Sequence, residues 1–281
     1  MKKYSPLIKS ELITERFVIP YRIYGNGGPQ LVCLNGVQQS MAMWHSFICR
    51  FSNDYRIVVF DFPGQGKAEV RLGEIGVSIE EQVSILKAVI EAADVHNITL
   101  CSASWGGVVA MLFASRYPKL IGRLILAGMG TRPNKKMVET IEQGCRIDPG
   151  RRKEVAQALI QSFGDNLPEN MKERIIKQFS LMTTEALRAF YEHGLFVLAA
   201  RDLSTVVDLK NIKVETILLN GEKDKIIDLE DVKFLATQIP GCKMKIVKGV
   251  GHFLHLEDES VLDVYREVLP QPTGIGLKIT N

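Results

Sequence analysis

Short apolar runs and amphipathic segments alternate along most of this chain. Six runs are short and mainly apolar, as is typical of strands buried on both faces of a parallel sheet. They span residues 30–36, 55–61, 98–103, 123–128, 214–224 and 243–247. Helix-like segments follow four of these runs, at residues 78–95, 105–118, 231–240 and 261–269. This alternation predicts a doubly wound α/β sheet, with helices on both faces of mostly parallel strands.

Two local signals refine the expected elements. Residues 15–25 alternate between apolar and polar positions and predict an antiparallel opening strand, which Pro20 should break. Ser78 and Glu81 have the spacing of a capping box, in which each side chain binds the backbone amide of the other. They predict the start of the helix over 78–95, whose apolar residues then recur at helical spacing.

The alternation is interrupted once, in the middle of the chain. The segments 171–182 and 184–200 have helical patterns, and no convincing strand lies near them. We therefore expect an α/β core in two parts, residues 1–130 and 206–281, and a helical lid inserted between them over residues 131–205. A lid above the strand ends would supply a substrate pocket and exclude water.

Composition and charge narrow the class of protein. With 46% hydrophobic and 24% charged residues, the chain of 281 residues has the balance of a soluble globular protein. No apolar run approaches the roughly 18 residues of a membrane helix, and the opening MKKYSPLIKS lacks the apolar core of a secretory signal. The net charge of +3 is too small to indicate nucleic acid. Five scattered cysteines without metal or redox spacing predict reduced thiols and a cytoplasmic protein.

The first candidate for chemistry is the stretch Ser102-Ala103-Ser104-Trp105-Gly106, at the junction of a strand and a helix. It has the form of the nucleophile elbow G-x-S-x-G, in which a sharp turn exposes the central serine. The flanking residues must be small there, because the two backbones nearly touch. Ser102 in place of the first glycine weakens the motif. The alternative is a tight turn whose serine hydroxyls only cap the following helix.

An acid and a histidine follow two later strands, in the order that this elbow requires. Asp224 comes just after the strand of 214–224, and His252 just after that of 243–247. Because catalytic groups in open α/β sheets collect beyond the carboxyl ends of strands, we expect both to meet Ser104. Glu222 or Asp228 could replace Asp224. His255 is interpreted as a residue that either supports His252 from nearby or lies on the surface. The remaining histidines are interpreted as surface or packing residues: His45, His96 and His193.

The expected roles follow from acyl-transfer chemistry. A serine hydroxyl needs a base within hydrogen-bond reach, so His252 would take the proton of Ser104, and Asp224 would orient the imidazole. The oxyanion needs two donors, for which we expect the backbone N–H groups of Val37 and Trp105. No metal, phosphate-loop or dinucleotide motif is present, and acyl transfer needs no cofactor.

The expected lid contributes two groups of side chains. Its large apolar residues could line an acyl slot or simply pack the lid helices together: Phe163, Phe179, Leu181, Met182, Phe190, Leu195, Phe196 and Leu198. Its first third is basic and could dock an acidic carrier protein, although a solvated helix face is the simpler interpretation. These basic residues are Lys135, Lys136, Arg151, Arg152 and Lys153.

Three motifs make the chain resemble a known group within the α/β-hydrolase superfamily: SASWGG (102–107), NGEKD (220–224) and GHFLHLE (251–257). They are similar to those of the RhlA family, the 3-(3-hydroxyalkanoyloxy)alkanoate synthases of rhamnolipid biosynthesis, and of PhaG-type 3-hydroxyacyl carrier-protein transacylases. The resemblance covers about residues 30 to 265 and implies an α/β-hydrolase fold with a Ser104–His252–Asp224 triad. The stretches NGVQQSMAMW and DFPGQGKA depart from the family and leave the acceptor and the chain length open.

The resemblance also implies a reaction. Ser104 would take a 3-hydroxyacyl group from a thioester of a carrier protein or coenzyme A, and the hydroxyl of a second chain would then attack the acyl-enzyme. The product would be a dimeric lipid acid, a biosurfactant precursor. Three alternatives use the same residues: an esterase or thioesterase, a carrier-protein:CoA transacylase, and a catalytically silent binding protein.

Overall fold

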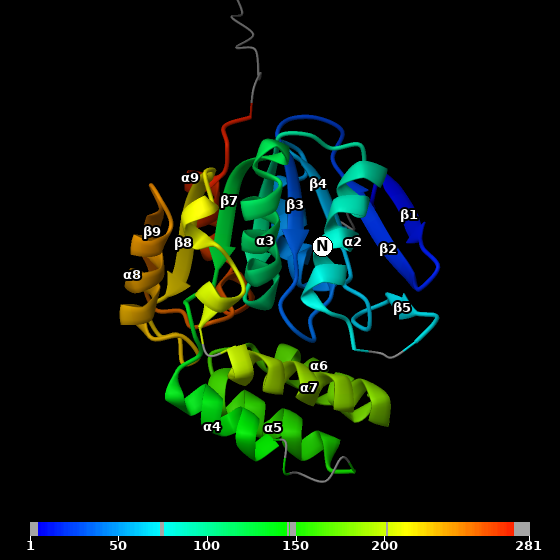
Figure 1. Cartoon of the computed structure of the whole chain (residues 1–281), viewed down its shortest axis with the longest axis vertical. Helices are drawn as coiled ribbons and strands as arrows, with labels where there is room; N and C mark the ends of the chain where they lie inside the picture. The colour runs from blue at the N-terminus through cyan, green and yellow to red at the C-terminus, as the bar shows by residue number, and fades with distance from the viewer. Residues whose placement is uncertain (1–4, 74–75, 145, 147–149, 201, 273–281) are drawn as a thin grey trace, which may run out of the picture.

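A mixed nine-stranded sheet forms the centre of the molecule (Figure 1). The computed structural model describes residues 5–73, 76–144, 146, 150–200 and 202–272. The strands are β1 Ile8–Ile13, β2 Phe17–Tyr24, β3 Gln30–Leu34, β4 Arg56–Phe60, β5 Glu69–Val70, β6 Ile98–Ala103, β7 Ile121–Ala127, β8 Glu215–Gly221 and β9 Lys243–Val247. Their order is β1-β2-β4-β3-β6-β7-β8-β9, and β5 pairs with β2. The six strands from β4 to β9 in that order are parallel, whereas β2 is antiparallel to its neighbours.

Helices cover both faces of the sheet and one of its ends. The α-helices are α1 His45–Phe51, α2 Ile79–Ala92, α3 Trp105–Arg116, α4 Lys135–Gly144, α5 Arg152–Phe163, α6 Glu169–Ser180, α7 Thr184–Ala200, α8 Leu229–Gln238 and α9 Val261–Val268. Short 3₁₀ turns span Met41–Trp44, Pro118–Leu120, Leu203–Thr205, Leu209–Asn211 and Leu254–Leu256. Side chains of α2, α3 and α8 belong to one buried cluster, and those of α1 and α9 to another. The doubly wound α/β architecture expected from the sequence is confirmed.

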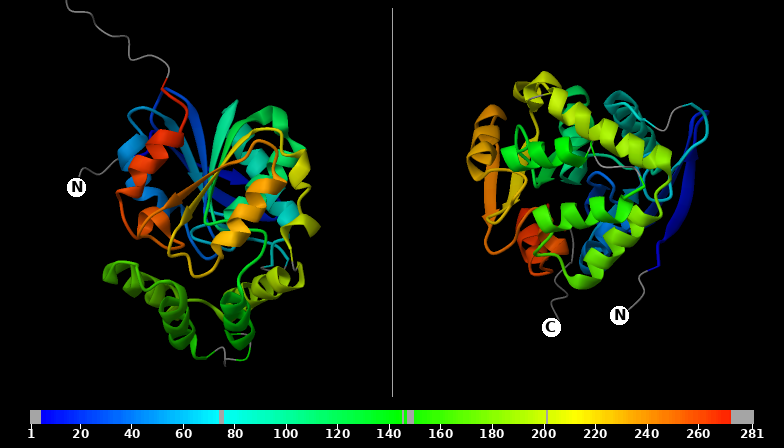
Figure 2. Two further views of the ribbon diagram at one scale, coloured as in Figure 1. Left: turned by 90° about the vertical axis from the view of Figure 1, so that its left-hand side faces the viewer. Right: turned by 90° about the horizontal axis from the view of Figure 1, so that it is seen from below.

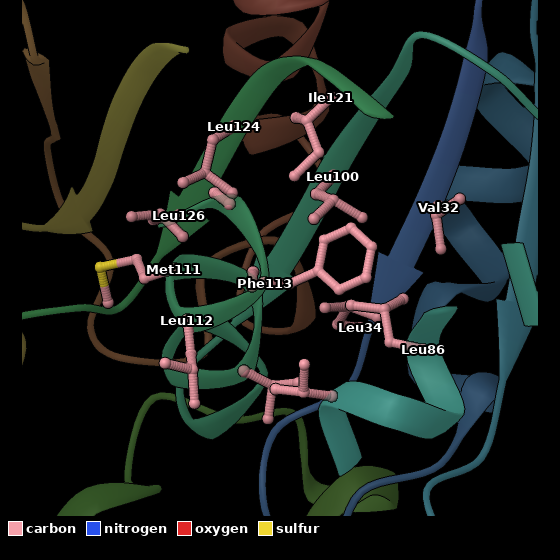
Figure 3. Packing of buried hydrophobic residues seen from close by; sticks show 14 of the residues in the cluster. Val32, Leu34, Leu86, Leu100, Met111, Leu112, Phe113, Ile121, Leu124 and Leu126 are labelled. Atoms are coloured by element: carbon pink, nitrogen blue, oxygen red, sulfur yellow. The ribbon is translucent and has the colours of Figure 1, made fainter. Parts of the chain in front are cut away.

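The packing explains why these segments form these elements. On one face, Val32, Leu100 and Leu124 of the sheet meet Phe113 of α3 and Leu86 of α2 (Figure 3). Helix α3 runs against the middle of the sheet and is apolar on nearly all sides, so it is buried along most of its length. Burial of this kind is the dominant favourable term in folding, at about 25 cal/mol per Å² of apolar surface.

The structure agrees with the predicted capping box and corrects the prediction for Pro20. The capping box of α2 is present, with Ser78 and Glu81 bound to each other's backbone amides. The expectation that Pro20 breaks the opening strand is wrong, because β2 continues through Pro20, which pairs with Glu11 of β1. On the other edge of β2, the ladder to β5 ends at Val18 and the ladder to β4 begins at Tyr21. Pro20 lies between these ladders, where its missing amide hydrogen is tolerated.

Helices α4 to α7 form the segment between β7 and β8 and lie together across one end of the sheet (Figures 1 and 2). This helical segment has a small core of its own, made by Val155, Ala156, Phe179 and Leu187. Its basic residues are partly engaged within the segment itself, since Lys136 Nζ donates to Ser162 O at 3.0 Å. Among the described residues, no helix is long and apolar enough to span a membrane.

Four cysteines are described, and all four are free thiols: Cys33, Cys49, Cys101 and Cys242. Cys33 and Cys101 lie side by side on β3 and β6 and are completely buried. Burial raises the pKa of the Cys33 thiol well above its ordinary value, so that this residue acts as a small apolar side chain. Cys145 lies outside the described residues.

Candidate active site

Ser104 occupies a sharp turn between β6 and α3. Its backbone has a φ of 47° and a ψ of −123°, a conformation that residues with a side chain rarely adopt. The turn is held by a hydrogen bond from Ser104 N to Ala127 O at 2.8 Å. The Ser104 side chain makes no capping bond to α3, which argues against the capping alternative, and it lines two cavities. Ser104 is thus half-buried in a strained turn, as in the nucleophile elbow that the sequence predicts.

The residues around Ser104 have separate structural tasks. Ser102 is fully buried, and its hydroxyl donates to Ile125 O at 3.2 Å on the neighbouring strand. Gly106 is the second residue of α3 and lies where the helix passes close to the end of β3. A Cβ atom on Gly106 would lie only 2.5 Å from Asn35 O and 2.8 Å from Leu34 O. Small residues are therefore required beside the elbow for steric reasons, as the sequence indicated.

His252 and Asp224 meet beyond the ends of β8 and β9. Asp224 Oδ2 lies 2.9 Å from His252 Nδ1. The other carboxylate oxygen of Asp224 accepts the amides of Ile226 at 2.8 Å and Ile227 at 3.0 Å. His252 faces the same cavity as Ser104, and its Cε1 would lie 3.0 Å from a Cβ placed on Gly128. Three residues that are distant in sequence thus gather at the carboxyl edge of the sheet.

The electrostatics of the pair favour an imidazole that can accept a proton. Burial opposes the charged form of Asp224, but His252 and the backbone amides outweigh it and hold the pKa of the carboxyl below its ordinary value. Burial likewise opposes protonated His252, yet the charge and hydrogen bond of Asp224 raise the pKa of the imidazole above 6.5. Asp224 is therefore ionised at neutral pH and stabilises the imidazolium.

The rival residues lie in other settings. Glu222 accepts the amide of Gly249 at 3.1 Å, and Asp228 immediately precedes α8 and accepts Asn134 Nδ2 at 3.2 Å. His255 is buried and lines the first cavity, so it is a residue beside the site and not a surface residue. Its ring stacks on Trp44 at 5.3 Å, and burial lowers its pKa to about 4.

The two backbone amides that the sequence predicts as oxyanion donors, those of Val37 and Trp105, belong to segments next to Ser104. Val37 follows β3 and lines both cavities with Ser104. Trp105 is the first residue of α3, where helix N–H groups lack intrahelical partners. Within the described part of the chain, neither amide donates to a protein acceptor. The N-terminus of α3 also places a favourable partial charge beside Ser104.

Two apolar cavities adjoin at Ser104. The first, of about 180 Å³, includes His252, Phe163 and Phe179, and the second, of about 170 Å³, includes Trp105 and His193. Both share Val37, Ser104, Met137, Phe190 and Ile226. Phe196 lines the second cavity, but Leu181, Met182, Leu195 and Leu198 line neither, and Leu181 is 73% exposed. The slot-lining interpretation therefore fits the four phenylalanines, and Met182 packs against the core of the helical segment. Leu181 and Leu195 are exposed and fit neither interpretation.

Several supporting residues were missed by the sequence patterns. Glu257 accepts the amides of Gly251 at 2.6 Å and Phe253 at 3.0 Å, and so braces the turn that carries His252. Gln82 accepts Trp105 Nε1 at 2.9 Å, which orients the indole. Gln82 is a buried polar residue on the apolar side of α2. A polar residue at an apolar position of a helix indicates a buried hydrogen-bond partner, so the sequence could have pointed to Gln82.

Comparison with known proteins places this architecture in a family. Residues 29–259 match the profile of the family described as alpha/beta hydrolase fold. The chain therefore belongs to the α/β-hydrolase family, and the fold expected from its motifs is confirmed. A solved relative has the same architecture: MGS-M2, an α/β-hydrolase enzyme from a Medee basin deep-sea metagenome library. It superposes with a TM-score of 0.77 at 20% identity, covering 92% of this chain and 97% of the other.

Two kinds of curated relatives are similar over most of the chain. The (R)-3-hydroxydecanoyl-ACP:CoA transacylase of Pseudomonas putida is 22% identical over 242 residues, which cover 85% of this chain and 81% of the relative. The 2-hydroxy-6-oxononadienedioate/2-hydroxy-6-oxononatrienedioate hydrolase of Escherichia coli K12 is 25% identical over 285 residues, covering 90% and 94%. The expected similarity to PhaG-type transacylases is confirmed, and the family relationship supports an acyltransferase or hydrolase.

Proposed function

We propose that this protein is a serine-dependent acyltransferase that joins 3-hydroxyacyl chains into 3-(3-hydroxyalkanoyloxy)alkanoic acids. The observation that carries the proposal is the pair of apolar cavities of similar size that adjoin at Ser104. A hydrolase needs room for one acyl chain and a water molecule. An enzyme that esterifies one chain with another needs two apolar sites and one nucleophile between them. The similarity to a 3-hydroxydecanoyl transacylase suggests the type of chain.

In the first half-reaction, Ser104 Oγ attacks the thioester carbonyl while His252 takes its proton. The amides of Val37 and Trp105 stabilise the oxyanion, each by an amount of about 3 kcal/mol in comparable sites. The C–S bond then breaks, the thiol leaves with the proton held by His252, and an ester remains on Ser104. Asp224 keeps the imidazole in the required tautomer.

In the second half-reaction, the 3-hydroxyl of another chain attacks the ester, again with His252 as base. If this second chain is a free 3-hydroxy acid, the product is the dimeric acid directly. If it is still a thioester, the dimer leaves on its carrier, and hydrolysis of that thioester releases the acid and the thiol. Because His252 is the base, the acceptor must approach on the side of His252, in the first cavity. The acyl chain held on Ser104 then extends into the second cavity, along Trp105 and Met129. Ser104 is released as the new ester forms, and its hydroxyl recovers the proton from His252. The helical segment covers this site and limits competition by water.

The same residues could support two other outcomes, which depend on the acceptor. Transfer to the thiol of coenzyme A would make the protein a transacylase, as the name of the Pseudomonas putida relative states for that protein. Transfer to water would make it an esterase or thioesterase. Mass spectrometry distinguishes these outcomes directly.

The decisive experiment incubates the protein with a 3-hydroxydecanoyl carrier-protein thioester, with and without coenzyme A. We expect the dimeric ester as the main product in both cases. Free 3-hydroxydecanoic acid alone would favour a thioesterase, and 3-hydroxydecanoyl-CoA would favour a transacylase. A fluorophosphonate probe should label wild-type protein at Ser104. Folded protein that fails to label would indicate a catalytically silent binding protein.

A further inference from the structure

We propose that Gln178, on α6 of the helical segment, positions the Val37 amide of the oxyanion hole through two intervening peptide groups. The inference rests on the proposed function, because it concerns the donor that stabilises the oxyanion on Ser104. It assigns to the helical segment a part in the chemistry itself, beyond covering the substrate.

The connection is a continuous chain of hydrogen bonds. Gln178 Nε2 donates to Gln38 O at 2.8 Å. That oxygen belongs to the same peptide group as Gln39 N, which donates to Gly36 O at 3.2 Å. Gly36 O in turn belongs to the same peptide group as the Val37 N–H. Two planar peptide groups therefore link the Gln178 amide to the proposed oxyanion donor.

The loop needs such support because its own conformation is unfavourable. Gln38 has a φ of 56°, a value that a residue with a side chain rarely adopts. Within the loop, Gln39 Oε1 also accepts Gly36 N at 2.9 Å, which fixes the near end of the same segment. The bond from Gln178 comes from outside the loop and restrains the orientation of the Gln38–Gln39 peptide group. The Gly36–Val37 peptide group is restrained in turn, because its oxygen accepts the hydrogen bond from Gln39 N.

This series of hydrogen bonds also makes the Val37 N–H a stronger donor. Hydrogen bonds in series polarise one another, so that a peptide whose carbonyl accepts a bond becomes a better N–H donor. Gln178 is exposed at the edge of the first cavity, where water competes for the bond. We therefore expect a moderate effect, smaller than the loss of a whole oxyanion donor, which costs about 100- to 1000-fold in turnover in a comparable enzyme.

A second contact between the helical segment and the core offers a matched control. Lys225 Nζ lies 2.6 Å from Asp165 Oδ2 and joins the β8–α8 loop to the α5–α6 loop. Neither residue touches the peptide groups between Gly36 and Gln39 in the described contacts. Lys225→Met thus loosens the contact of the helical segment with the core, but it leaves the hydrogen bonds between Gln178 and the Gly36–Val37 peptide group in place.

The experiment compares Gln178→Met, Gln178→Lys and Lys225→Met with the wild-type protein. Met has a length close to that of Gln but donates no hydrogen bond, and Lys restores a donor. We measure pre-steady-state acylation by p-nitrophenyl decanoate, inhibition by a decyl trifluoromethyl ketone, and inhibition by decan-1-ol. The ketone forms a hemiketal oxyanion on Ser104. Decan-1-ol is measured as a competitive inhibitor of the free enzyme, before an acyl-enzyme exists, and its binding there forms no oxyanion.

For Gln178→Met we expect acylation to slow about tenfold and the ketone to bind about tenfold more weakly, with decanol inhibition changed less than twofold. Gln178→Lys should recover most of both losses, and Lys225→Met should resemble the wild type in both. The proposal is overturned if Gln178→Met leaves acylation and ketone binding unchanged. It is overturned equally if Gln178→Met weakens decanol as much as the ketone, or if Lys225→Met causes the same loss.

Failure of this inference is distinguishable from failure of the proposed function. If Ser104→Ala abolishes acylation while Gln178→Met behaves as wild type, only the role of Gln178 is wrong. If Ser104→Ala still acylates, the proposed nucleophile is wrong, and the inference is overturned with it.

Discussion

His252 Nδ1 lies 2.9 Å from Asp224 Oδ2 across a separation of 28 residues, and this contact predicts the pH dependence of turnover. Asp224 raises the pKa of His252 above 6.5, and a protonated imidazole cannot act as base. Activity should therefore fall on acidification at a pH above that of an ordinary histidine. The measurement is kcat/KM for a p-nitrophenyl acyl ester against pH, and an acid limb centred below 6.5 would contradict it.

Replacing Asp224 by Asn should show two effects of this carboxylate, one on the pKa of His252 and one on its tautomer. The charge that raises the pKa of His252 is lost, while burial, which lowers it, remains. The acid limb should move to lower pH, and kcat should fall by up to about 10⁴-fold because the favoured tautomer changes. Glu222→Gln serves as the control, because Glu222 binds the Gly249 amide, away from His252. Equal losses in both variants would point to a different acid.

Substitutions at the elbow should distinguish the catalytic role of Ser104 from the structural role of Ser102. Ser104→Ala should keep the fold and abolish turnover, and Ser104→Gly should also raise stability by about 1 kcal/mol, because glycine adopts a φ of 47° without strain. Ser102→Ala should leave substantial activity and cost about 1 kcal/mol, the value of its bond to Ile125 O. Urea denaturation and ester turnover test these values. Equal loss of activity at both serines would mean that the wrong hydroxyl had been chosen.

Filling each cavity in turn should affect different half-reactions. Val197→Phe narrows the second cavity and should slow acylation by decanoyl esters at least tenfold, with little effect on acetyl esters. Ile160→Phe narrows the first cavity and should reduce formation of the dimeric ester relative to hydrolysis. Each change should cost about 1–3 kcal/mol of stability through overpacking. Identical product ratios in the two variants would argue against separate sites.

The close approach of Gly106 to β3 predicts a stability effect. In Gly106→Ala the new Cβ would lie 2.5 Å from Asn35 O, and rigid backbone cannot move aside easily. We expect a loss of about 2 kcal/mol in the free energy of unfolding, with reduced activity as the elbow shifts. Gly27→Ala is the control, because no atom lies within 4 Å of its added Cβ. Its stability should stay within about 0.5 kcal/mol of the wild type.

The sequence by itself determined most elements of the α/β core and their order. The parallel strands, the start of α2 at its capping box, and helices α3, α8 and α9 could be predicted because each depends on residues close together in the chain. Strands β1 and β5 and helix α1 were not predicted. The candidate residues Ser104, Asp224 and His252 could be named for a related reason. Parallel strands bring their carboxyl ends to one edge, so position just after a strand already suggests position in space.

Only the tertiary structure decided the contacts between segments that have no local pattern in common. The passage of β2 through Pro20 depends on where the ladders of neighbouring strands end. The burial of His255 against Trp44, and the bond from Gln178 to Gln38 across 140 residues, arise from packing of whole elements. Periodicity records which side of an element is apolar. It does not record which distant residue will face that side, because that choice is made by the packing of the complete chain.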